Sequence, residues 1–108
     1  VERLKDSDLV VWTGGEDINP RLYGEINASD ASGHPVSHYS ENRDRLDVIA
    51  IEQAKDRFKI GICRGAQLLN CIPNGGRLWQ HVDHHGGHHR ISDTIIQEEH
   101  TINSLHHQ

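Results

Sequence analysis

The chain has 108 residues, a hydrophobic content of 34% and a formal net charge of −5, which suits one small domain but hardly two. Because the net charge is negative and lysine and arginine form no block, neither nucleic acid nor an anionic membrane is an expected partner. No apolar run approaches the roughly 20 residues that cross a bilayer, and no charged-then-apolar leader opens the chain, so we expect a soluble cytoplasmic protein.

The first half of the chain predicts a strand, a loop and a helix, in that order. Residues 8–15 read DLVVWTGG, a short apolar run stopped by two glycines, which is typical of a buried strand ending in a loop. Pro20 and Gly24 then break any regular element, and the polar residues 27–40 predict a loop or a lid. Ser40 is a suitable N-cap for the helix that follows. The predicted apolar face of this helix consists of residues at three- and four-residue steps: Leu46, Ile49, Ala50, Ala54 and Phe58.

The second half predicts another strand and another helix before a histidine-rich segment. KIGIC, residues 59–63, reads as a strand, and RGAQLLNCI, residues 64–72, as a helix that ends near Pro73. Residues 77–90 are loop-like, and residues 93–105 could hold one or two strands. Strand, helix, strand, helix in this order indicates an α/β layer with a parallel sheet.

Cys63 lies between two glycines at the predicted strand-to-helix turn. Residues 61–65, GICRG, have the G-x-nucleophile-x-G form known for serine on such a turn, where flanking glycines relieve crowding around a strained residue. The helix N-terminus would favour a thiolate, and the amide of Arg64 would face the oxygen of an attacked carbonyl. On these five residues alone, a small buried thiol at a strand end is an equally good interpretation. A helix between Cys63 and Cys71 would hold the two residues about 12 Å apart, too far for a disulfide, and this supports a reducing compartment.

Four motifs in fixed order extend the pattern beyond this turn: VVWTGGEDINPRLYGE (10–25), GICRGAQLLN (61–70), NGGRLWQHVD (74–83) and NSLHHQ (103–108). With them, the chain resembles the class I glutamine amidotransferase-like superfamily from Leu9 to Gln108, and within it the γ-glutamyl-γ-aminobutyrate hydrolase-like branch. The resemblance implies a doubly wound, mostly parallel α/β sheet of flavodoxin-like layer architecture, incomplete at both ends in this chain. It also implies cysteine-dependent hydrolysis of a γ-glutamyl amide, either glutamine or a γ-glutamyl amine, without a cofactor.

The resemblance assigns the catalytic groups as well. Cys63 falls on the nucleophile, and the backbone amides of Gly15 and Arg64 fall on the two donors of the oxyanion hole. In the implied reaction a thiolate attacks the amide carbonyl, and the two N–H groups stabilise the oxyanion. Ammonia or an amine then leaves, and water releases glutamate from the thioester.

The same resemblance implies that Gly14, Gln67, His106 and His107 contact the substrate, a small γ-glutamyl molecule. Gln67 lies one turn into the helix after the cysteine, where it could instead hydrogen-bond the backbone of the turn. Whether ammonia passes to a synthetase partner stays open.

Members of the family carry the catalytic histidine and its acid in a Trp-His-Pro-Glu-like motif beyond the NSLHHQ segment, and they begin with strands before Val1. This chain contains no such motif and no methionine. We therefore interpret residues 1–108 as the central part of a single amidotransferase-like domain, which should be inactive alone because acylation needs a base. Processing or trimming is the alternative explanation of the missing methionine.

Ten histidines are present, and five of them lie in HVDHHGGHH, residues 81–89. With Asp83 they could bind zinc or nickel, but adjacent histidines in a glycine-broken loop do not converge on one tetrahedral point. No Cys-x-x-Cys or His-Glu-x-x-His motif supplies a preformed site. We predict a solvated loop at the mouth of the active site and no tight metal site.

The other prominent side chains have structural interpretations. Trp12 and Trp79 are expected to pack in the core or at its rim. Arg43, Asp44 and Asp47 are expected to form a solvated helix face with ion pairs worth a few tenths of a kcal/mol. Two alternatives to the enzyme stay open: a non-catalytic or degenerate amidotransferase-like fragment with a binding role, and a histidine-rich metal-binding module.

Overall fold

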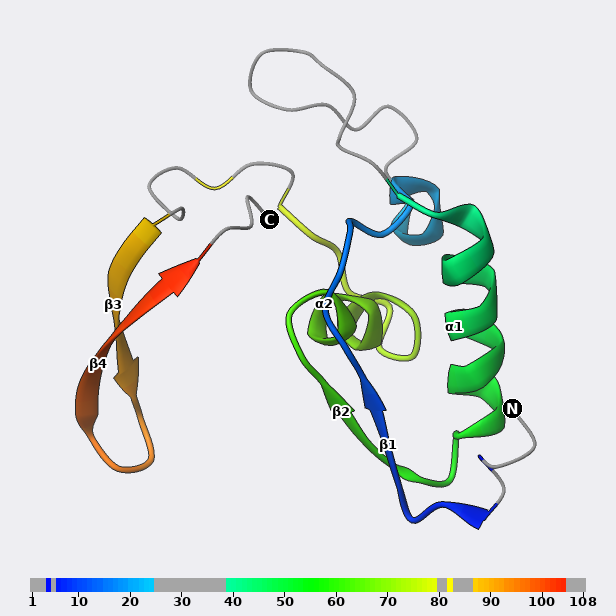
Figure 1. Ribbon diagram of the computed structural model, residues 1–108, viewed down its shortest axis with the longest axis horizontal. Helices are drawn as coiled ribbons and strands as arrows, with labels where there is room; N and C mark the ends of the chain where they lie inside the picture. Colours follow the sequence, from blue (N-terminus) through cyan, green and yellow to red (C-terminus); the bar gives the residue numbers. More distant parts are fainter. Residues whose placement is uncertain (1–3, 5, 25–38, 80–81, 83–86, 105–108) are drawn as a thin grey trace. The chain divides into compact units, whose positions relative to one another are not determined.

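The computed structural model describes residues 4, 6–24, 39–79, 82 and 87–104 (Figure 1). The chain divides into two compact units, Val1–Leu78 and Trp79–Gln108. In chain order the elements are β1 (Leu9–Trp12), the 3-10 helix η2 (Pro20–Tyr23), α1 (Glu41–Gln53), β2 (Phe58–Gly61), α2 (Arg64–Cys71), β3 (Gly87–Asp93) and β4 (Glu98–Ser104).

In the first unit, β1 and β2 pair in parallel, with Leu9 opposite Phe58 and Trp12 opposite Gly61. Figure 1 shows the two strands side by side, with α1 and α2 beside them. Side chains alternate between the two faces of a strand, and those of Val10 and Trp12 join the core that the helices cover. The buried apolar residues of this core are Trp12, Ile18, Tyr23, Ile51, Ala54, Leu68 and Cys71. The predicted α/β class with a parallel sheet is confirmed, and so is the packing role of Trp12.

The opposite face of this sheet is apolar and exposed. Alternate residues of β1 and β2 point to it, and the residue after β2 extends the row. Their exposed fractions are 46% for Leu9, 45% for Val11, 79% for Phe58, 49% for Ile60 and 55% for Ile62.

Helix α1 begins as predicted, because the Ser40 hydroxyl accepts a hydrogen bond from the Arg43 amide at 3.3 Å. The prediction of its apolar face is wrong in part. Leu46 and Ile49 are 47% and 41% exposed, and Phe58 lies in β2 rather than on the helix. The helix instead turns Asp44 inward, with 2% exposure. The reason lies outside the helix: Asp44 pairs with the positive charge of Arg64.

The segment from Asn19 to Gly24 is more regular than its sequence indicated. Pro20 starts the short helix η2, the Asn19 side chain accepts a hydrogen bond from the Arg21 amide at 3.1 Å, and Gly24 ends the turn at φ 85°. Proline and glycine thus set the bounds of this element, and the helix between them is limited to a single short turn.

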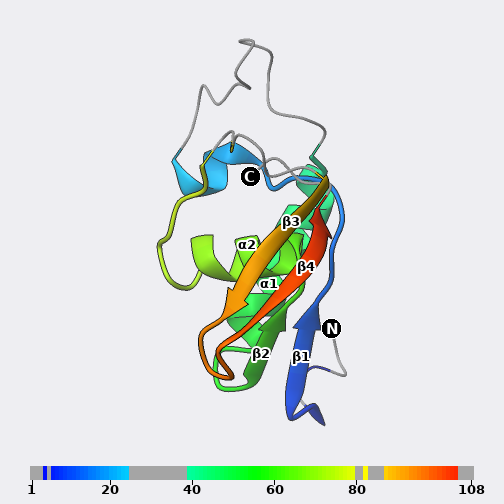
Figure 2. The ribbon, with the colours of Figure 1, turned by 90° about the vertical axis from the view of Figure 1, so that its left-hand side faces the viewer.

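The second unit contains an antiparallel hairpin in which β3 and β4 lie side by side (Figure 2), with Gly87 opposite Ser104 and Asp93 opposite Glu98. The Asp93 carboxylate accepts hydrogen bonds from the amides of Ile95 and Ile96 and so stabilises the turn. The prediction of a loop through Arg90 is wrong, because β3 already begins at Gly87.

Two further features concern packing and membranes. Trp79 is 82% exposed, so the expectation that it packs in the core or at its rim is wrong. Within the described ranges, none of the helices combines the length and the apolar character that a membrane crossing requires.

Candidate active site at the turn between β2 and α2

Cys63 forms the sharp turn between β2 and α2. Its backbone has φ 54° and ψ −116°, a left-handed conformation that costs a non-glycine residue about 1–3 kcal/mol. It is the N-cap residue of α2: its carbonyl accepts hydrogen bonds from the amides of Ala66 and Gln67 at 2.9 and 3.2 Å. Its side chain makes no capping hydrogen bond and is exposed. The predicted strand-turn-helix geometry is therefore confirmed, and it leaves the thiol accessible.

The two glycines that flank the turn are needed for close packing. A Cβ on Gly61 would overlap the backbone of Ala66, and a Cβ on Gly65 would overlap the Trp12 carbonyl. The first approach brings α2 back onto β2, and the second brings it onto the end of β1. A hydrogen bond from the Ile62 amide to the Trp12 carbonyl, at 2.9 Å, joins the same strand ends. The spacing G-x-C-x-G thus follows from backbone contacts on both sides of the cysteine.

The loop after β1, residues 13–16, passes close to the cysteine side chain; we call it the glycine loop. A Cβ on Gly14 would lie 3.4 Å from Cys63 Cβ and 3.9 Å from its Sγ. Gly15 follows with φ 154°, which a residue with a side chain rarely adopts. The structure therefore brings Gly14, Gly15, Cys63 and Arg64 to the same edge of the parallel sheet.

Arg43, in the first turns of α1, binds the glycine loop. Its Nη2 donates to the Gly14 carbonyl at 2.9 Å and to the Thr13 carbonyl at 3.5 Å, and its Nη1 donates to Glu16 Oε2 at 3.1 Å. A Cβ on Gly15 would overlap the guanidinium. One side chain of α1 therefore contacts all four residues of the loop.

Arg64, directly after the cysteine, carries a guanidinium that is 1% exposed. Its Nη2 donates to Asp44 Oδ1 at 2.5 Å, and its Nη1 donates to Asp47 Oδ2 at 2.7 Å. The second oxygen of Asp44 accepts a hydrogen bond from the Asn19 amide at 3.0 Å. Because a buried charge needs such partners, α1 turns two carboxylates toward α2.

Asp47 connects the two arginines, since its Oδ2 also lies 3.7 Å from Arg43 Nε. The prediction of a solvated helix face for Arg43, Asp44 and Asp47 is therefore wrong. The spacing of Asp44 and Asp47 carried a signal that could have found this cluster: residues three apart share one helix face. A second signal was Arg64, because it stands at the first position of a helix that packs against the strands.

The pKa values of the Cys71 thiol and of the Glu16 carboxyl are both shifted from their ordinary values. Burial raises the pKa of the Cys71 thiol to about 11, and both cysteines are free. A hydrogen bond from the Glu16 backbone amide lowers the pKa of the Glu16 carboxyl, and the positive charges of Arg43 and Arg64 act in the same direction. The glycine loop therefore ends in a carboxylate that the two arginines stabilise.

The remaining predicted residues are placed only in part. Gln67 is half-buried in the first turn of α2, where its backbone amide donates to the Cys63 carbonyl at 3.2 Å. His106 and His107 lie outside the described residues, as does most of the histidine-rich loop. Residues 88–89 of that loop belong to β3. Among the residues that the structure describes, no three histidine, cysteine or acidic side chains form a group that could hold a metal.

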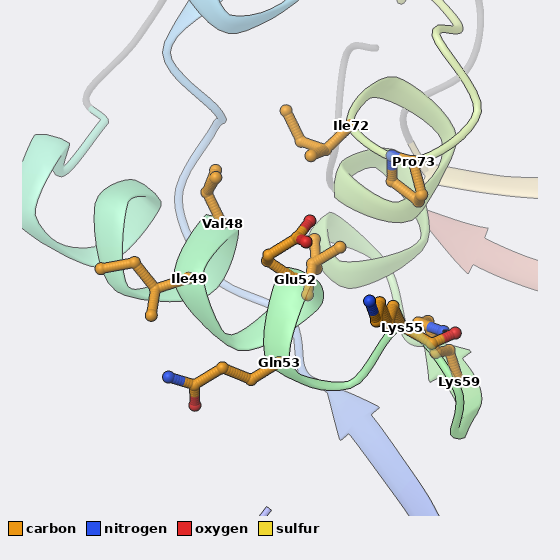
Figure 3. Close-up of a pocket in the computed structure, with 9 residues that line it drawn as sticks. Val48, Ile49, Glu52, Gln53, Lys55, Lys59, Ile72 and Pro73 are labelled. Carbon is orange, nitrogen blue, oxygen red and sulfur yellow. Dashed lines mark hydrogen bonds between the residues drawn. The ribbon is translucent and has the colours of Figure 1, made fainter.

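A pocket of about 690 Å³ lies at the other end of the first unit, between the second half of α1 and the segment after α2 (Figure 3). Val48, Ile51 and Ile72 supply apolar walls, and Lys55 and Lys59 also line it. Cys63 lines neither this pocket nor the smaller one of about 300 Å³ beside the start of α1. The candidate site at Cys63 is thus separate from both of these pockets.

Comparisons with known proteins agree with this geometry. The family model Peptidase C26 matches residues 2–108. YvdE of Lactococcus lactis subsp. lactis (strain IL1403), whose name describes it as glutamine amidotransferase-like, is 34% identical over an alignment that covers 94% of this chain and 50% of that protein. RP404 of Rickettsia prowazekii (strain Madrid E), named in the same way, is 37% identical over 76 residues, which cover 68% of this chain and 25% of that protein.

A homologue of YvdE from Lactococcus lactis subsp. cremoris is 33% identical, over 94% of this chain and 62% of its own length. The chain therefore spans between half and two thirds of the YvdE proteins that it matches. No solved structure matches the chain significantly.

Proposed function

Since the chain belongs to the Peptidase C26 family, within the class I glutamine amidotransferase-like superfamily, we propose that it carries the nucleophile of an enzyme that hydrolyses γ-glutamyl amides. The family indicates cysteine-dependent amide hydrolysis in general. The γ-glutamyl substrate, glutamine or a γ-glutamyl amine, is the more specific part of the proposal, and it rests on the motif resemblance.

One observation carries the proposal: the exposed Cys63 thiol stands on a strained turn at φ 54°, beside a loop that contains two glycines. The first N–H groups of a helix lack intrahelical acceptors and point toward the space beyond its N-terminus. The Arg64 amide is the first of them in α2. Together with the Gly15 amide it forms the proposed oxyanion hole.

The reaction then proceeds in two steps. The Cys63 sulfur attacks the side-chain carbonyl of the substrate, an S–C bond forms, and the C–N bond breaks as the amine leaves with a proton. Water next attacks the thioester, so that glutamate leaves and the thiol is restored. Gly14, Gln67, His106 and His107 are proposed to contact the glutamyl part. The base that moves the protons is proposed to lie in a His- and acid-containing segment beyond Gln108.

The setting of the enzyme is part of the same proposal. Two free cysteines support a cytoplasmic location, where thiols stay reduced. The proposed partner is the small γ-glutamyl substrate itself, without nucleic acid, membrane or cofactor.

The test is glutamate release by the protein in its full encoded length, supplied with glutamine and with several γ-glutamyl amines. We expect turnover of at least one of them, and Cys63→Ala should abolish it. Cys71→Ala is the matched control: this thiol is buried in the core, so turnover per folded molecule should persist. A full-length protein that is inert toward all these amides would favour a binding role instead. Undiminished turnover by Cys63→Ala would disprove the assignment of the nucleophile.

A further inference from the structure

The glycine loop has few means of its own to hold a fixed position. Two of its four residues are glycines, which lack side chains, and Gly15 adopts φ 154°. The loop nevertheless passes so close to Cys63 that a Cβ on Gly14 would be in van der Waals contact with the cysteine side chain. A proposed oxyanion donor in such a segment needs support from outside the loop, because the hydrogen bonds of a hole depend on geometry.

Arg43 supplies that support through its planar guanidinium. The group donates to two carbonyls of the loop, Thr13 and Gly14, and to the Glu16 carboxylate. A peptide unit is planar, so fixing the Gly14 carbonyl also orients the amide of Gly15 in the same unit. The orientation of a proposed donor thus depends on a side chain of α1.

The same guanidinium is linked to the other side of the hole. Asp47 Oδ2 lies 3.7 Å from Arg43 Nε and accepts from Arg64 Nη1 at 2.7 Å. Arg64 is the residue whose amide forms the second proposed donor, and its side chain is held by Asp44 as well. The chain of contacts runs from the glycine loop through Arg43 and Asp47 to Arg64.

We infer that Arg43 is a positioning residue: with Asp47 as the link, it fixes the Gly15 amide relative to the Arg64 amide and to the Cys63 sulfur. The inference rests on the proposed function. Arg43 contacts the loop from the side of α1, and in this proposal it does not contact the substrate. Its effect should therefore appear in the transition state, when the oxyanion forms, and much less in the binding of the ground state.

The experiment compares Arg43→Gln, Arg43→Lys and Asp47→Asn with the unchanged protein in its full encoded length. Arg43→Gln should lower kcat about 10- to 100-fold, since misplacing one donor approaches the loss of a donor. KM should stay within about threefold. Arg43→Lys keeps the charge but loses the fork that spans two carbonyls, so it should restore only part of kcat.

Two further measurements separate positioning from a structural role. Guanidinium ion added at millimolar concentration should raise kcat of Arg43→Gly, because it can occupy the space of the missing group, and should leave the unchanged protein unaffected. The double variant Arg43→Gln, Asp47→Asn should be hardly slower than Arg43→Gln alone, because both changes break one unit. The matched control is Arg45→Gln, which removes the same charge from an exposed position of the same helix, where the contact is with Asn42.

The outcomes are distinct. If the unchanged protein hydrolyses a γ-glutamyl amide and Cys63→Ala does not, the proposed function holds. An Arg43→Gln variant with unchanged kcat would then overturn the inference alone. A rise in KM with constant kcat, or equal losses in Arg43→Gln and Arg45→Gln, would overturn it as well. If the unchanged protein is inert, the proposed function fails and the inference falls with it.

Discussion

Arg64 and Asp44 form an ion pair in the interior of the first unit: Nη2 of the arginine lies 2.5 Å from Oδ1 of the aspartate, and the side chains are 1% and 2% exposed. The pair joins the residue after Cys63 to α1, the helix that also holds the glycine loop. The ion pair explains why α1 buries the carboxylate of Asp44, whereas the apolar periodicity of the helix predicts that Leu46 and Ile49 are buried. Three predictions concern this pair and the turn that it supports, a fourth concerns the buried thiol of Cys71, and a fifth concerns the glycine loop.

Removing one partner of the buried pair should destabilise the protein strongly. Asp44→Ala leaves the Arg64 guanidinium with the half-buried Asp47 as its carboxylate partner among the described residues, and breaking a buried pair in this way costs about 3–5 kcal/mol. Denaturant unfolding of the full-length protein measures the loss. The exposed Glu41→Gln, in the first turn of the same helix, is the control and should cost less than about 1 kcal/mol. A loss below 1 kcal/mol in Asp44→Ala would show that solvent reaches the pair.

Gly65→Ala should damage the turn, because the new methyl group would overlap the Trp12 carbonyl. We expect a loss of about 1–3 kcal/mol in the free energy of unfolding and a fall in turnover, since α2 must move away from β1. Gly75→Ala is the comparison. Its backbone has φ 67° but nothing lies within 4 Å of the added Cβ, so only about 1–2 kcal/mol of conformational strain is expected. Equal turnover in the two variants would contradict the close-packing explanation.

Iodoacetamide should label Cys63 well before Cys71. The first thiol is exposed at the start of α2, whereas the second is buried and its pKa is raised to about 11. Mass spectrometry after brief treatment at pH 7.5 identifies the labelled peptide. Equal labelling at this pH would mean that the core around Cys71 opens readily.

The raised pKa of Cys71 also predicts a dependence of stability on pH. The folded state favours the neutral thiol, so this contribution is complete below the ordinary pKa of 9.0 and is lost as the pH rises through about 11. Cys71→Ala removes the contribution. The difference in unfolding midpoint between the unchanged protein and this variant should therefore shrink between pH 9 and pH 11.

The Glu16 carboxylate should stabilise the protein at neutral pH and not in acid. Its pKa is lowered from 4.5, first by the hydrogen bond from its own amide and then by Arg43. A lowered pKa means that the contribution is present above pH 4.5 and disappears as the pH falls through the folded-state value. The unfolding midpoints of the unchanged protein and of Glu16→Gln should therefore differ at pH 7 and converge toward pH 3. A constant difference over this range would assign the effect to something other than ionisation.

Local patterns in the sequence determined the strands β1 and β2, the start of α1 at Ser40 and the turn at Cys63. Each depends on residues that are neighbours in the chain: apolar runs of strand length, a capping hydroxyl, and glycines two positions on either side of the cysteine. The family resemblance added the expected roles of Cys63, Gly15 and Arg64, and these stay predictions. For His106 and His107, which lie outside the described residues, the contact with substrate is likewise a prediction.

Only the tertiary structure decided which face of α1 is buried and what holds the glycine loop. The apolar periodicity of α1 favours Leu46 and Ile49 as core residues, yet both are exposed. Asp44 is buried because the Arg64 guanidinium, 20 residues further along the chain, would otherwise lie in the interior without a counter-charge. Arg43 likewise meets carbonyls 29 and 30 residues earlier in the chain. Such pairings form between segments that pack together only after folding, so a pattern within one helix cannot reveal them.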